Sequence, residues 1–325
     1  MQRVVLGATG LKVTPLAYGT WQFGGDWGPV DEKAAISAIQ NVRSLGINFF
    51  DTAAAYGFGR SERLLGAALA ADLRESRNSI VIATKGGLRM DGDRLVRDAS
   101  PGWLRQGVES SLAALGTDYI DLYQVHWPDP ATPIRETAGA LAELVGEGLI
   151  RHVGVSNYST AQIDEFSAVL PAETVQPPYH LFRRDIEADL LPYAASHDIG
   201  VLAYGPLAHG LLGGAINEAT TFGPGDWRSH SPAFTGQGFG RNLRVVAELR
   251  RFAAERGATV AQLAVAWVLA NPAVQVAIVG ARTPAHLAES IRARDLTLSR
   301  ADLAEIDLIM AAAVPVGGPS PEGMS

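Results

Sequence analysis

The sequence predicts a single (β/α)8 TIM barrel, an α/β fold in which eight parallel strands alternate with helices. Eight short apolar segments of the buried-strand type alternate with segments of helical periodicity, and eight strands close such a barrel. No linker rich in proline, glycine and serine divides the 325 residues into two halves. The alternative, a doubly wound sheet, is disfavoured because neither G-x-G-x-x-G nor G-x-x-x-x-G-K-[ST] occurs.

The predicted strands and helices follow one another along the whole chain. The strands span residues 15–20, 47–51, 79–84, 119–126, 150–156, 174–176, 200–204 and 274–280. The first helix is expected to begin after Asp31 and to end at Gly46, because these residue types commonly cap helices. Its apolar residues recur at the three- and four-residue spacing of one helix face. Further helices are expected near residues 60–71, 101–115, 134–146, 159–169, 186–197, 241–256, 260–270 and 284–293.

Three segments fall outside this alternation. Residues 3–13, RVVLGATGLKV, are typical of a small hairpin ahead of the first barrel strand. Residues 205–240 form a long glycine-rich connection, and loops of this length are usually functional lids or disordered segments. The third segment is the C-terminal tail over residues 314–325, which we expect to be disordered. Residues 1–313 are expected to form one barrel domain.

The composition excludes several classes of function. The net charge of −7 and the isoelectric point near 5.5 disfavour a general affinity for nucleic acid or for anionic membranes. The absence of cysteine excludes disulfides, thiolate metal sites and a cysteine nucleophile, and we expect no metal site. No apolar run approaches the length of a membrane span, and the first residues lack the core of a signal peptide. We therefore expect a cytoplasmic protein.

Lysine is rare in this chain, which makes its positions informative. Of 27 basic residues, only Lys12, Lys33 and Lys85 are lysine, and Lys85 directly follows the predicted strand SIVIAT. Arginine is a planar fork that stays charged in proteins, whereas lysine is a compact point charge whose pKa can be tuned. Lys85 is therefore a candidate for chemistry that an arginine could not perform.

Four polar residues are expected to meet at one end of the barrel. Asp51, Lys85 and His126 end the second, third and fourth predicted strands, and Tyr56 lies in the loop after the second. The carboxyl ends of all barrel strands form one face, which carries the active site in this fold. Each residue alone has a structural explanation, such as a buried ion pair or a packed aromatic ring. Together they have the composition of an acid–base catalytic site.

The chemistry of such a site is the protonation of a carbonyl oxygen. A tyrosine hydroxyl has a pKa of about 10, which is too high for easy proton donation at neutral pH. A neighbouring ammonium lowers that pKa, and a carboxylate beside the lysine keeps the lysine charged. An imidazole N–H can hold the oxygen on which negative charge develops during reduction. No side chain supplies a hydride, so a nicotinamide cofactor must.

The chain resembles the aldo-keto reductases over essentially its full length. The stretch GINFFDTAAAYGFGRSERLLG is similar to the family motif G-x-[NR]-x-x-D-T-A-x-x-Y-G, with Asp51 and Tyr56 on its catalytic positions. The stretches IVIATKGG and DYIDLYQVHWPD resemble the strands that carry the family's lysine and histidine, and LIRHVGVSNYS resembles its G-[VL]-S-N segment. The stretches HWPD and YGPLAHGLL are most similar to the bacterial-type branch and the branch of the potassium-channel β-subunits.

The resemblance implies a role for each matching residue. Ser156, Asn157 and Gln176 would bind the nicotinamide carboxamide, and Tyr204 would stack on the nicotinamide ring. By the same resemblance, the cofactor contacts at the first two strands would be Gly19, Thr20, Trp21 and Asp51. The loop over the pyrophosphate would contribute Gly205, Pro206, Leu207, Gly210 and Leu211. The adenosine end would be bound by Gly280, Ala281, Arg282, His286 and Glu289.

The resemblance also implies a small-molecule carbonyl substrate that is reduced with NADPH, and it leaves the oligomeric state open. Trp21, Tyr56, His126 and Trp127 would line the substrate site. We expect NADPH because Arg282 begins the helix after the eighth strand, where a guanidinium can grip the 2′-phosphate in a bidentate way.

Two other functions are compatible with parts of this pattern. A lysine at a strand end is also the nucleophile of Schiff-base aldolases, but an acid and a tyrosine beside Lys85 would keep its amine charged. The channel β-subunits bind a nicotinamide cofactor while they serve as interaction proteins. The complete set of Asp51, Tyr56, Lys85 and His126, without an added interaction domain, favours an enzyme.

Overall fold

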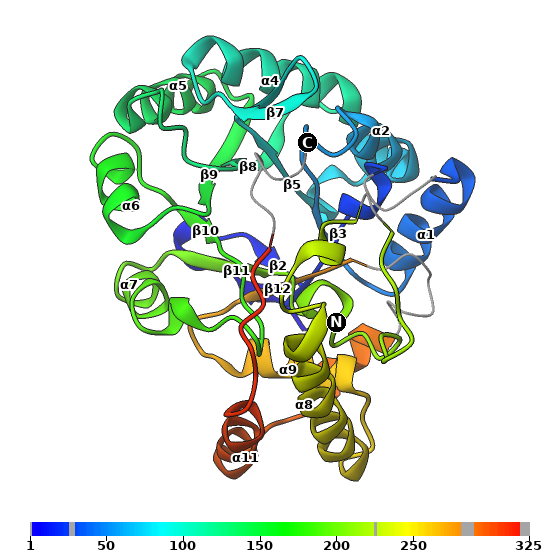
Figure 1. Cartoon of the computed structure of the whole chain (residues 1–325). Helices are drawn as coiled ribbons and strands as arrows, with labels where there is room; N and C mark the ends of the chain where they lie inside the picture. Colours follow the sequence, from blue (N-terminus) through cyan, green and yellow to red (C-terminus); the bar gives the residue numbers. More distant parts are fainter. Residues whose placement is uncertain (1, 26–29, 224–225, 281–288, 319–325) are drawn as a thin grey trace.

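The protein folds into a closed barrel of eight parallel strands inside a ring of helices (Figure 1). The computed structural model describes residues 2–25, 30–223, 226–280 and 289–318. The strands neighbour one another in the order β10-β11-β12-β3-β4-β5-β8-β9, which confirms the predicted fold class. Their bounds are β3 (Leu16–Gly19), β4 (Phe49–Asp51), β5 (Val81–Gly86), β8 (Ile120–Val125), β9 (Ile150–Ser156), β10 (Thr174–Gln176), β11 (Gly200–Tyr204) and β12 (Val276–Gly280).

Most helices lie where the apolar periodicity predicts them. The first predicted helix, α1 (Glu32–Ser44), begins after Asp31, whose carboxylate accepts hydrogen bonds from the backbone N–H groups of two following residues. The helix predicted over residues 60–71 is split into α2 (Arg60–Ala68) and α3 (Ala70–Glu75). The others are α4 (Pro101–Leu115), α5 (Ile134–Gly146), α6 (Thr160–Ser167), α7 (Leu190–Ser196), α8 (Gly236–Glu255) and α9 (Val260–Ala270).

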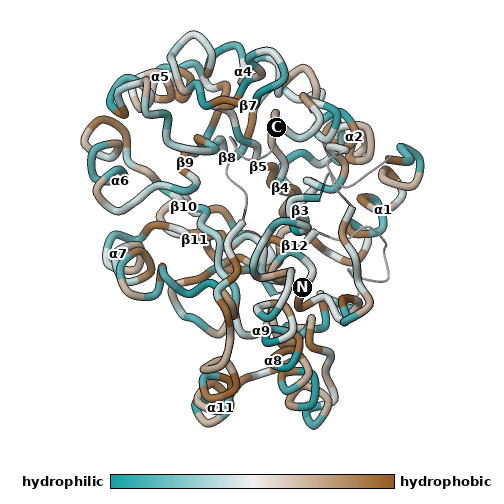
Figure 2. The backbone as a smooth tube through the Cα atoms, viewed as in Figure 1, coloured by the Kyte–Doolittle hydropathy of each residue, from teal (hydrophilic) through white to brown (hydrophobic). Residues whose placement is uncertain are grey.

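Two apolar layers hold the barrel together. The inner layer fills the barrel with alternating strand side chains such as Phe49, Leu122 and Val276, all of them fully buried. The predicted N-terminal hairpin, β1 (Val4–Val5) and β2 (Lys12–Val13), adds Leu6 and Val13 to this layer. The larger outer layer lies between strands and helices, and the helices alternate between hydrophilic and hydrophobic stretches accordingly (Figure 2).

Two elements were absent from the sequence prediction. The hairpin of β6 (Leu88–Asp91) and β7 (Arg94–Arg97) follows β5 at the end of the barrel where the candidate residues lie. Helix α11 (Arg300–Met310) packs against α8 near the end of the chain. It begins with a capping box in which the Ser299 and Asp302 side chains and backbones bond reciprocally.

The first residues of the predicted tail, 314–318, are in contact with the rest of the chain. The backbone N–H of Val316 donates to the carbonyl of Phe182, and that of Val314 donates to the Asn242 side chain. Val316 is fully buried in the main apolar core, which explains why a segment rich in proline and glycine is held in place. Figure 1 shows this segment, in red, running from α11 back toward the centre of the barrel.

The long connection after β11 carries structure of its own. Helix α8 begins at Gly236, five residues before the predicted start at residue 241. Ahead of it, the rings of Phe222 and Trp227 both pack edge-on against Phe234, with centroids 5.5 and 5.7 Å away. Trp227 is thus a packed aromatic residue of this connection. The candidate loop Gly205–Leu211 is anchored to the same cluster through His209, whose ring lies 4.8 Å from that of Trp227.

Candidate active site at the carboxyl ends of the strands

A buried ion pair forms the base of the candidate site. The ammonium of Lys85, at the end of β5, lies 2.6 Å from Oδ1 of Asp51, the last residue of β4. The same ammonium donates to the carbonyl of Thr52 at 2.8 Å. The Lys85 and Asp51 side chains are only 1% and 4% exposed, so each charge depends on the other. Burial lowers the pKa of Lys85, and the contact with Asp51 opposes this effect.

Tyr56 lies between this ion pair and two other rings. The Lys85 ammonium is 5.4 Å from the centre of the Tyr56 ring. The ring of Tyr56 meets that of His126 edge-on at 5.8 Å and lies nearly parallel to that of Trp21 at 6.3 Å. The loop can pass this close because residue 57 is glycine: a Cβ there would lie 2.3 Å from the carbonyl of Gly24. The four predicted catalytic residues are therefore brought together.

His126 follows β8 and is tied to its neighbouring strand by its backbone. Its N–H donates to the carbonyl of Gly86, and its own carbonyl accepts from the Asn157 side chain at 3.0 Å. Burial, and secondly the charge of Lys85, lower the pKa of His126 well below its usual value. The imidazole is thus neutral at neutral pH and carries a single N–H. Its Nδ1 is buried and has no hydrogen-bond partner among the described residues.

A set of amide and hydroxyl groups continues the site along β9, β10 and β11. The Ser156 hydroxyl donates to the backbone carbonyl of Gln176 at 2.8 Å. The Asn157 amide donates to Ser156 Oγ at 3.1 Å, and its oxygen accepts from the Tyr204 hydroxyl at 2.9 Å. The Gln176 amide donates to Asp51 Oδ2 at 2.9 Å, which connects this set to the ion pair. Asn157 has a φ of 61°, a left-handed conformation that asparagine tolerates better than most residues.

This set has the chemistry that a flat carboxamide-bearing ring requires. An amide ligand needs both donors and acceptors, and Ser156, Asn157 and Gln176 offer both from adjacent strands. Tyr204 at the end of β11 adds an aromatic ring beside them, and burial raises its pKa to about 12, so that it stays neutral. The residues that the family resemblance assigns to the nicotinamide therefore fit such a group by their hydrogen-bond donors and acceptors.

The remaining predicted cofactor residues lie on the same rim. Gly19 ends β3 beside Asp51 in the strand register, and Thr20 donates through its hydroxyl to the Asp51 carbonyl at 3.1 Å. After β11, Gly205 has a φ of 69°, which glycine adopts without strain. The loop then continues through Pro206, Leu207, Gly210 and Leu211, and Leu211 is fully buried. Trp127 lies next to His126, where the Arg97 guanidinium of β7 stands 4.9 Å from the centre of its ring.

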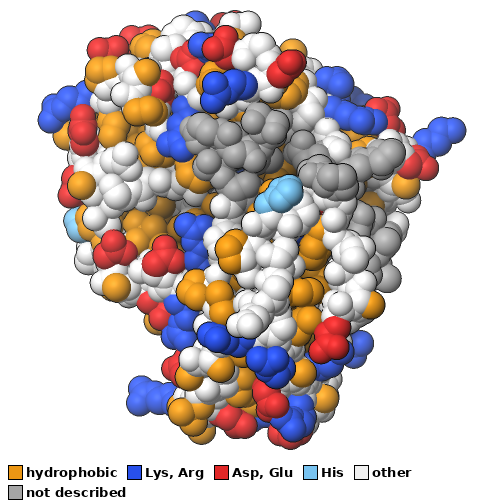
Figure 3. All heavy atoms as spheres, in the orientation of Figure 1, with side chains coloured by type: hydrophobic (Ala, Val, Ile, Leu, Met, Phe, Trp, Pro, Cys, Tyr) orange, Lys and Arg blue, Asp and Glu red, His pale blue; other side chains and the backbone are white. Residues whose placement is uncertain are grey.

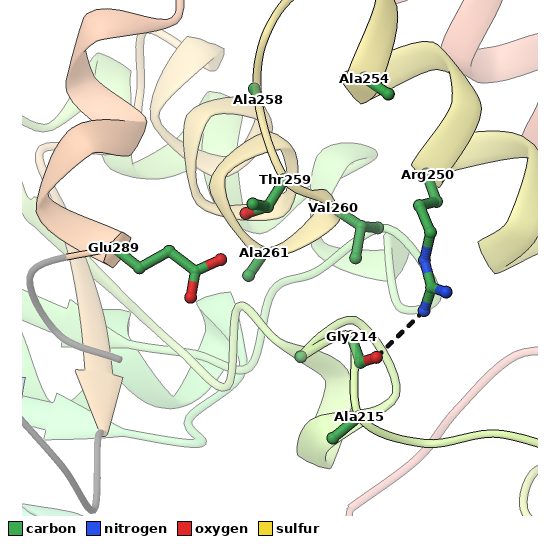
Figure 4. Close-up of a pocket in the computed structure, with 10 residues that line it drawn as sticks. Gly214, Ala215, Arg250, Ala254, Ala258, Thr259, Val260, Ala261 and Glu289 are labelled. Carbon is green, nitrogen blue, oxygen red and sulfur yellow. Dashed lines mark hydrogen bonds between the residues drawn. The ribbon is translucent and has the colours of Figure 1, made fainter. Parts of the chain in front are cut away.

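The predicted adenosine end is described only in part. Gly280 ends β12 and is exposed, whereas Ala281, Arg282 and His286 lie outside the described residues. Glu289 lies at the edge of a cavity of about 450 Å³, opposite Arg250 and next to Thr259 at the start of α9 (Figure 4). Arg250 donates to the carbonyl of Gly214 across this cavity at 3.1 Å. The cavity is a pocket that the sequence did not predict, because its lining comes from three distant segments.

The described residues offer neither a metal site nor a membrane span. Within the described ranges, no group of three histidine, aspartate or glutamate side chains could hold a metal ion. No helix in this part of the chain has the length and apolarity that crossing a membrane requires. On the face shown in Figure 3, acidic and basic side chains are mixed, and no continuous basic surface is visible.

Comparisons with known proteins agree with this architecture. The family model described as "Aldo/keto reductase family" matches residues 15–311. The aldo-keto reductase YhdN of Bacillus subtilis is 42% identical over 323 residues, which cover 98% of this chain and 96% of the relative. The NADH-specific methylglyoxal reductase of Escherichia coli is 33% identical over 93% of this chain and 96% of its own.

A solved structure covers the whole chain. The glycerol dehydrogenase AKR11B4 from Gluconobacter oxydans is 40% identical, with a TM-score of 0.89 over 100% of this chain and 99% of the other. The likeness therefore extends from the sequence to the fold of the whole chain. The chain belongs to the aldo/keto reductase family of oxidoreductases.

Proposed function

We propose that this protein reduces aldehydes and ketones to alcohols with NADPH and that Tyr56 is the general acid. The observation that carries this proposal is the position of Tyr56, which lies between the buried Lys85–Asp51 pair and the ring of His126. Membership of the family supports the use of a nicotinamide cofactor and a small carbonyl substrate.

The proton would come from the Tyr56 hydroxyl. The nicotinamide supplies a hydride to the carbonyl carbon when it is bound. The carbonyl oxygen then takes the proton of Tyr56, so that the products are an alcohol and a phenolate that solvent reprotonates. The ammonium of Lys85 stabilises this phenolate, and Asp51 holds the ammonium in place at 2.6 Å.

His126 would orient the carbonyl without taking part in proton transfer. Because its pKa lies well below the usual value, the ring stays neutral and can donate one N–H to the oxygen that gains negative charge. A charged imidazolium at this place would compete with Tyr56 as the acid. Trp21 and Trp127, next to Tyr56 and His126 respectively, would form the walls of the substrate site.

The cofactor would lie across the strand ends from β9 to β12. Ser156, Asn157 and Gln176 would bind its carboxamide, and Tyr204 would stack on its ring. Gly205, Pro206, Leu207, Gly210 and Leu211 would cover the pyrophosphate with their backbone. Glu289, one of the residues assigned to the adenosine end, lines the cavity of about 450 Å³, and this cavity would receive that end.

The choice of NADPH over NADH rests on Arg282. One relative is named as NADH-specific, so the family alone does not decide the cofactor. A guanidinium at the start of a helix would bind the 2′-phosphate of NADPH with charge-assisted hydrogen bonds, which NADH cannot form. Gly19, Thr20, Gly280, Ala281 and His286 would complete the cofactor contacts on either side.

The alternative function is that of a nicotinamide-binding interaction protein with little turnover, as the channel β-subunits suggest. A substrate panel would distinguish the two. Wild-type protein with NADPH is assayed by cofactor absorbance against 4-nitrobenzaldehyde, methylglyoxal and glyceraldehyde, with NADH in parallel. Turnover of at least one carbonyl supports the enzyme. Tight NADPH binding without turnover of any of them would support the interaction protein instead.

A further inference from the structure

A second carboxylate lies behind the catalytic lysine, on the outer side of the barrel wall. Glu62 belongs to α2 and is only 1% exposed. Its Oε1 accepts a hydrogen bond of 2.6 Å from the hydroxyl of Thr84, the residue directly before Lys85 on β5. Successive strand residues point to opposite faces, so Thr84 points toward the helices while Lys85 points into the barrel.

The burial of Glu62 needs an explanation because it is costly. An ionised carboxylate in an apolar layer loses several kcal/mol of hydration unless charges or hydrogen bonds compensate it. Its ordinary place would be on the solvent side of an amphipathic helix such as α2. Thr84 compensates it only in part, since one hydroxyl satisfies one of four acceptor sites.

The groups that act on Glu62 lie on β5, on α2 itself, on α4 and on β8. Lys85 on β5 and Arg63 on α2 are the positive charges that act on it, and Ser111 on α4 lies beside it. On β8, the negative charge of Glu62 adds to burial in raising the pKa of the Tyr123 hydroxyl. This buried hydroxyl has no hydrogen-bond partner among the described residues. Burial raises the pKa of Glu62, whereas Thr84, Ser111, Lys85 and Arg63 lower it.

The pKa of Lys85 responds to burial and to its neighbours in the opposite direction from that of Glu62. Burial lowers the pKa of Lys85, and three interactions raise it again, namely the charge of Asp51, the hydrogen bond to Asp51 and the charge of Glu62. Asp51 does not act on the lysine alone, because its Oδ2 accepts from the Gln176 amide at 2.9 Å. Part of its negative charge is therefore engaged by a residue of the proposed cofactor site.

We propose that Glu62 is a positioning residue for the proton donor: from the outer side of β5 it supports the positive charge of Lys85 on the inner side. Asp51 acts on the ammonium by direct contact, and Glu62 acts on it through the thickness of the strand. Glu62 lies on the outer side of the strand, so its part in proton donation runs through the lysine. The consequence for catalysis depends on the proposed function, whereas the effect on Lys85 does not.

The rarity of lysine makes a direct test possible. Protein labelled with 13C at lysine Cε contains only Lys12, Lys33 and Lys85, so each signal can be assigned and titrated by NMR. In Glu62→Gln, the Lys85 signal should titrate at lower pH than in the wild type. The expected change is a roughly tenfold larger proton-dissociation constant, the size of one pKa unit. Lys12 and Lys33 serve as internal references.

Two further variants separate this effect from loss of structure. Thr84→Val keeps the shape of the side chain but removes its hydrogen bond to Glu62. Loss of this bond favours the protonated form of the Glu62 carboxyl, so the titration of Lys85 should shift in the same direction as in Glu62→Gln, but by less. Asp121→Asn removes another buried carboxylate of β8, which pairs with Arg77, and should leave the Lys85 titration unchanged. If Lys85 titrates alike in the wild type, Glu62→Gln and Thr84→Val, the proposal is wrong.

The titration and the proposed function can fail separately. Near-normal carbonyl reduction by Tyr56→Phe would remove the catalytic role of the tyrosine and would leave the NMR result intact. If Glu62→Gln does not fold, the Thr84→Val titration still decides the proposal, because threonine and valine have the same shape.

Discussion

The ammonium of Lys85 and the carboxylate of Asp51 lie 2.6 Å apart with almost no access to solvent. Such a pair contributes little to stability, because desolvation of both groups offsets most of their attraction. The contribution of the pair is to the electrostatics of the candidate site. It keeps one positive charge in an apolar barrel, 5.4 Å from the centre of the Tyr56 ring, where that charge can stabilise a phenolate.

Substitution of Tyr56 by phenylalanine should remove most of the activity while the affinity for the cofactor is retained. General acid–base groups typically contribute about 10²- to 10⁴-fold to a rate, and kcat should fall by roughly that factor. The affinity for NADPH, measured by fluorescence quenching, should change little because the ring is retained. Tyr119→Phe, at a tyrosine whose hydroxyl donates to Asn78 at the surface, is the matched control. Near-normal reduction by Tyr56→Phe would contradict the assignment.

Loss of Lys85 should affect both activity and stability. Lys85→Met leaves Asp51 buried without its partner, which should lower the free energy of unfolding by about 3–5 kcal/mol. The double variant Lys85→Met/Asp51→Leu should recover part of this stability in urea unfolding, since no uncompensated charge remains. Neither variant should reduce carbonyls. Activity in the double variant, or equal stability of the two, would contradict this account of the pair.

Three histidines with lowered pKa values should make the protein sensitive to mild acid. Burial, followed by the charges of Arg183 and Arg228, lowers the pKa of His209 to about 4, and burial lowers those of His126 and His180 as well. An unfolded histidine has a pKa of about 6.5, so the unfolded chain binds protons first as the pH falls. Stability should therefore be complete above about pH 6.5 and should decline toward about pH 4.

His209→Asn tests the contribution of His209 to this effect. Asparagine tolerates the left-handed backbone at this position, where φ is 54°. The loss of unfolding free energy between about pH 6.5 and pH 4 should be smaller in this variant, by up to about 3 kcal/mol. Urea unfolding at a series of pH values measures the difference. Parallel curves for the variant and the wild type would show that His209 does not contribute.

The barrel could be predicted because its signals are local and repeated. Each strand is a short apolar run, and the side chains of Asp51, Lys85 and His126 stand at the ends of such runs, where the fold brings them together. The missed elements also carried a signal. The β6–β7 hairpin turns at Gly92, which has a φ of 61°, and its register pairs Asp91 with Arg94 across a two-residue turn.

Glu62 and the tail could not be predicted in the same way. A glutamate in a helix is normally solvated, and nothing in its local pattern shows that Thr84 and Lys85 lie on the adjacent strand. The burial of Val316 likewise depends on Phe182, which is more than a hundred residues away in the chain. Both are consequences of tertiary packing that the periodicity of a single segment does not contain.

Binding of NADPH should protect the connection between residues 205 and 240 from proteolysis. The Gly205–Leu211 loop would cover the pyrophosphate, and the aromatic packing of Trp227 against His209 would transmit this order to the rest of the connection. Limited proteolysis with and without NADPH, with the fragments identified by mass, measures the protection. The exposed turn at Gly92 in the β6–β7 hairpin provides a comparison site. A lack of protection anywhere in 205–240 would exclude a role as a lid.

Replacement of Arg282 by alanine should separate the two nicotinamide cofactors. The 2′-phosphate of NADPH carries a charge near −2, and each charge-assisted hydrogen bond to it contributes about 1.5–3 kcal/mol, which corresponds to roughly one to two decades in affinity. Arg282→Ala should therefore weaken NADPH by about that factor and leave NADH nearly unchanged. Arg292→Ala, at the next arginine along the chain, is the matched control for a general loss of positive charge. Equal affinity of the wild type for both cofactors, or equal weakening of both by Arg282→Ala, would show that Arg282 does not bind the phosphate.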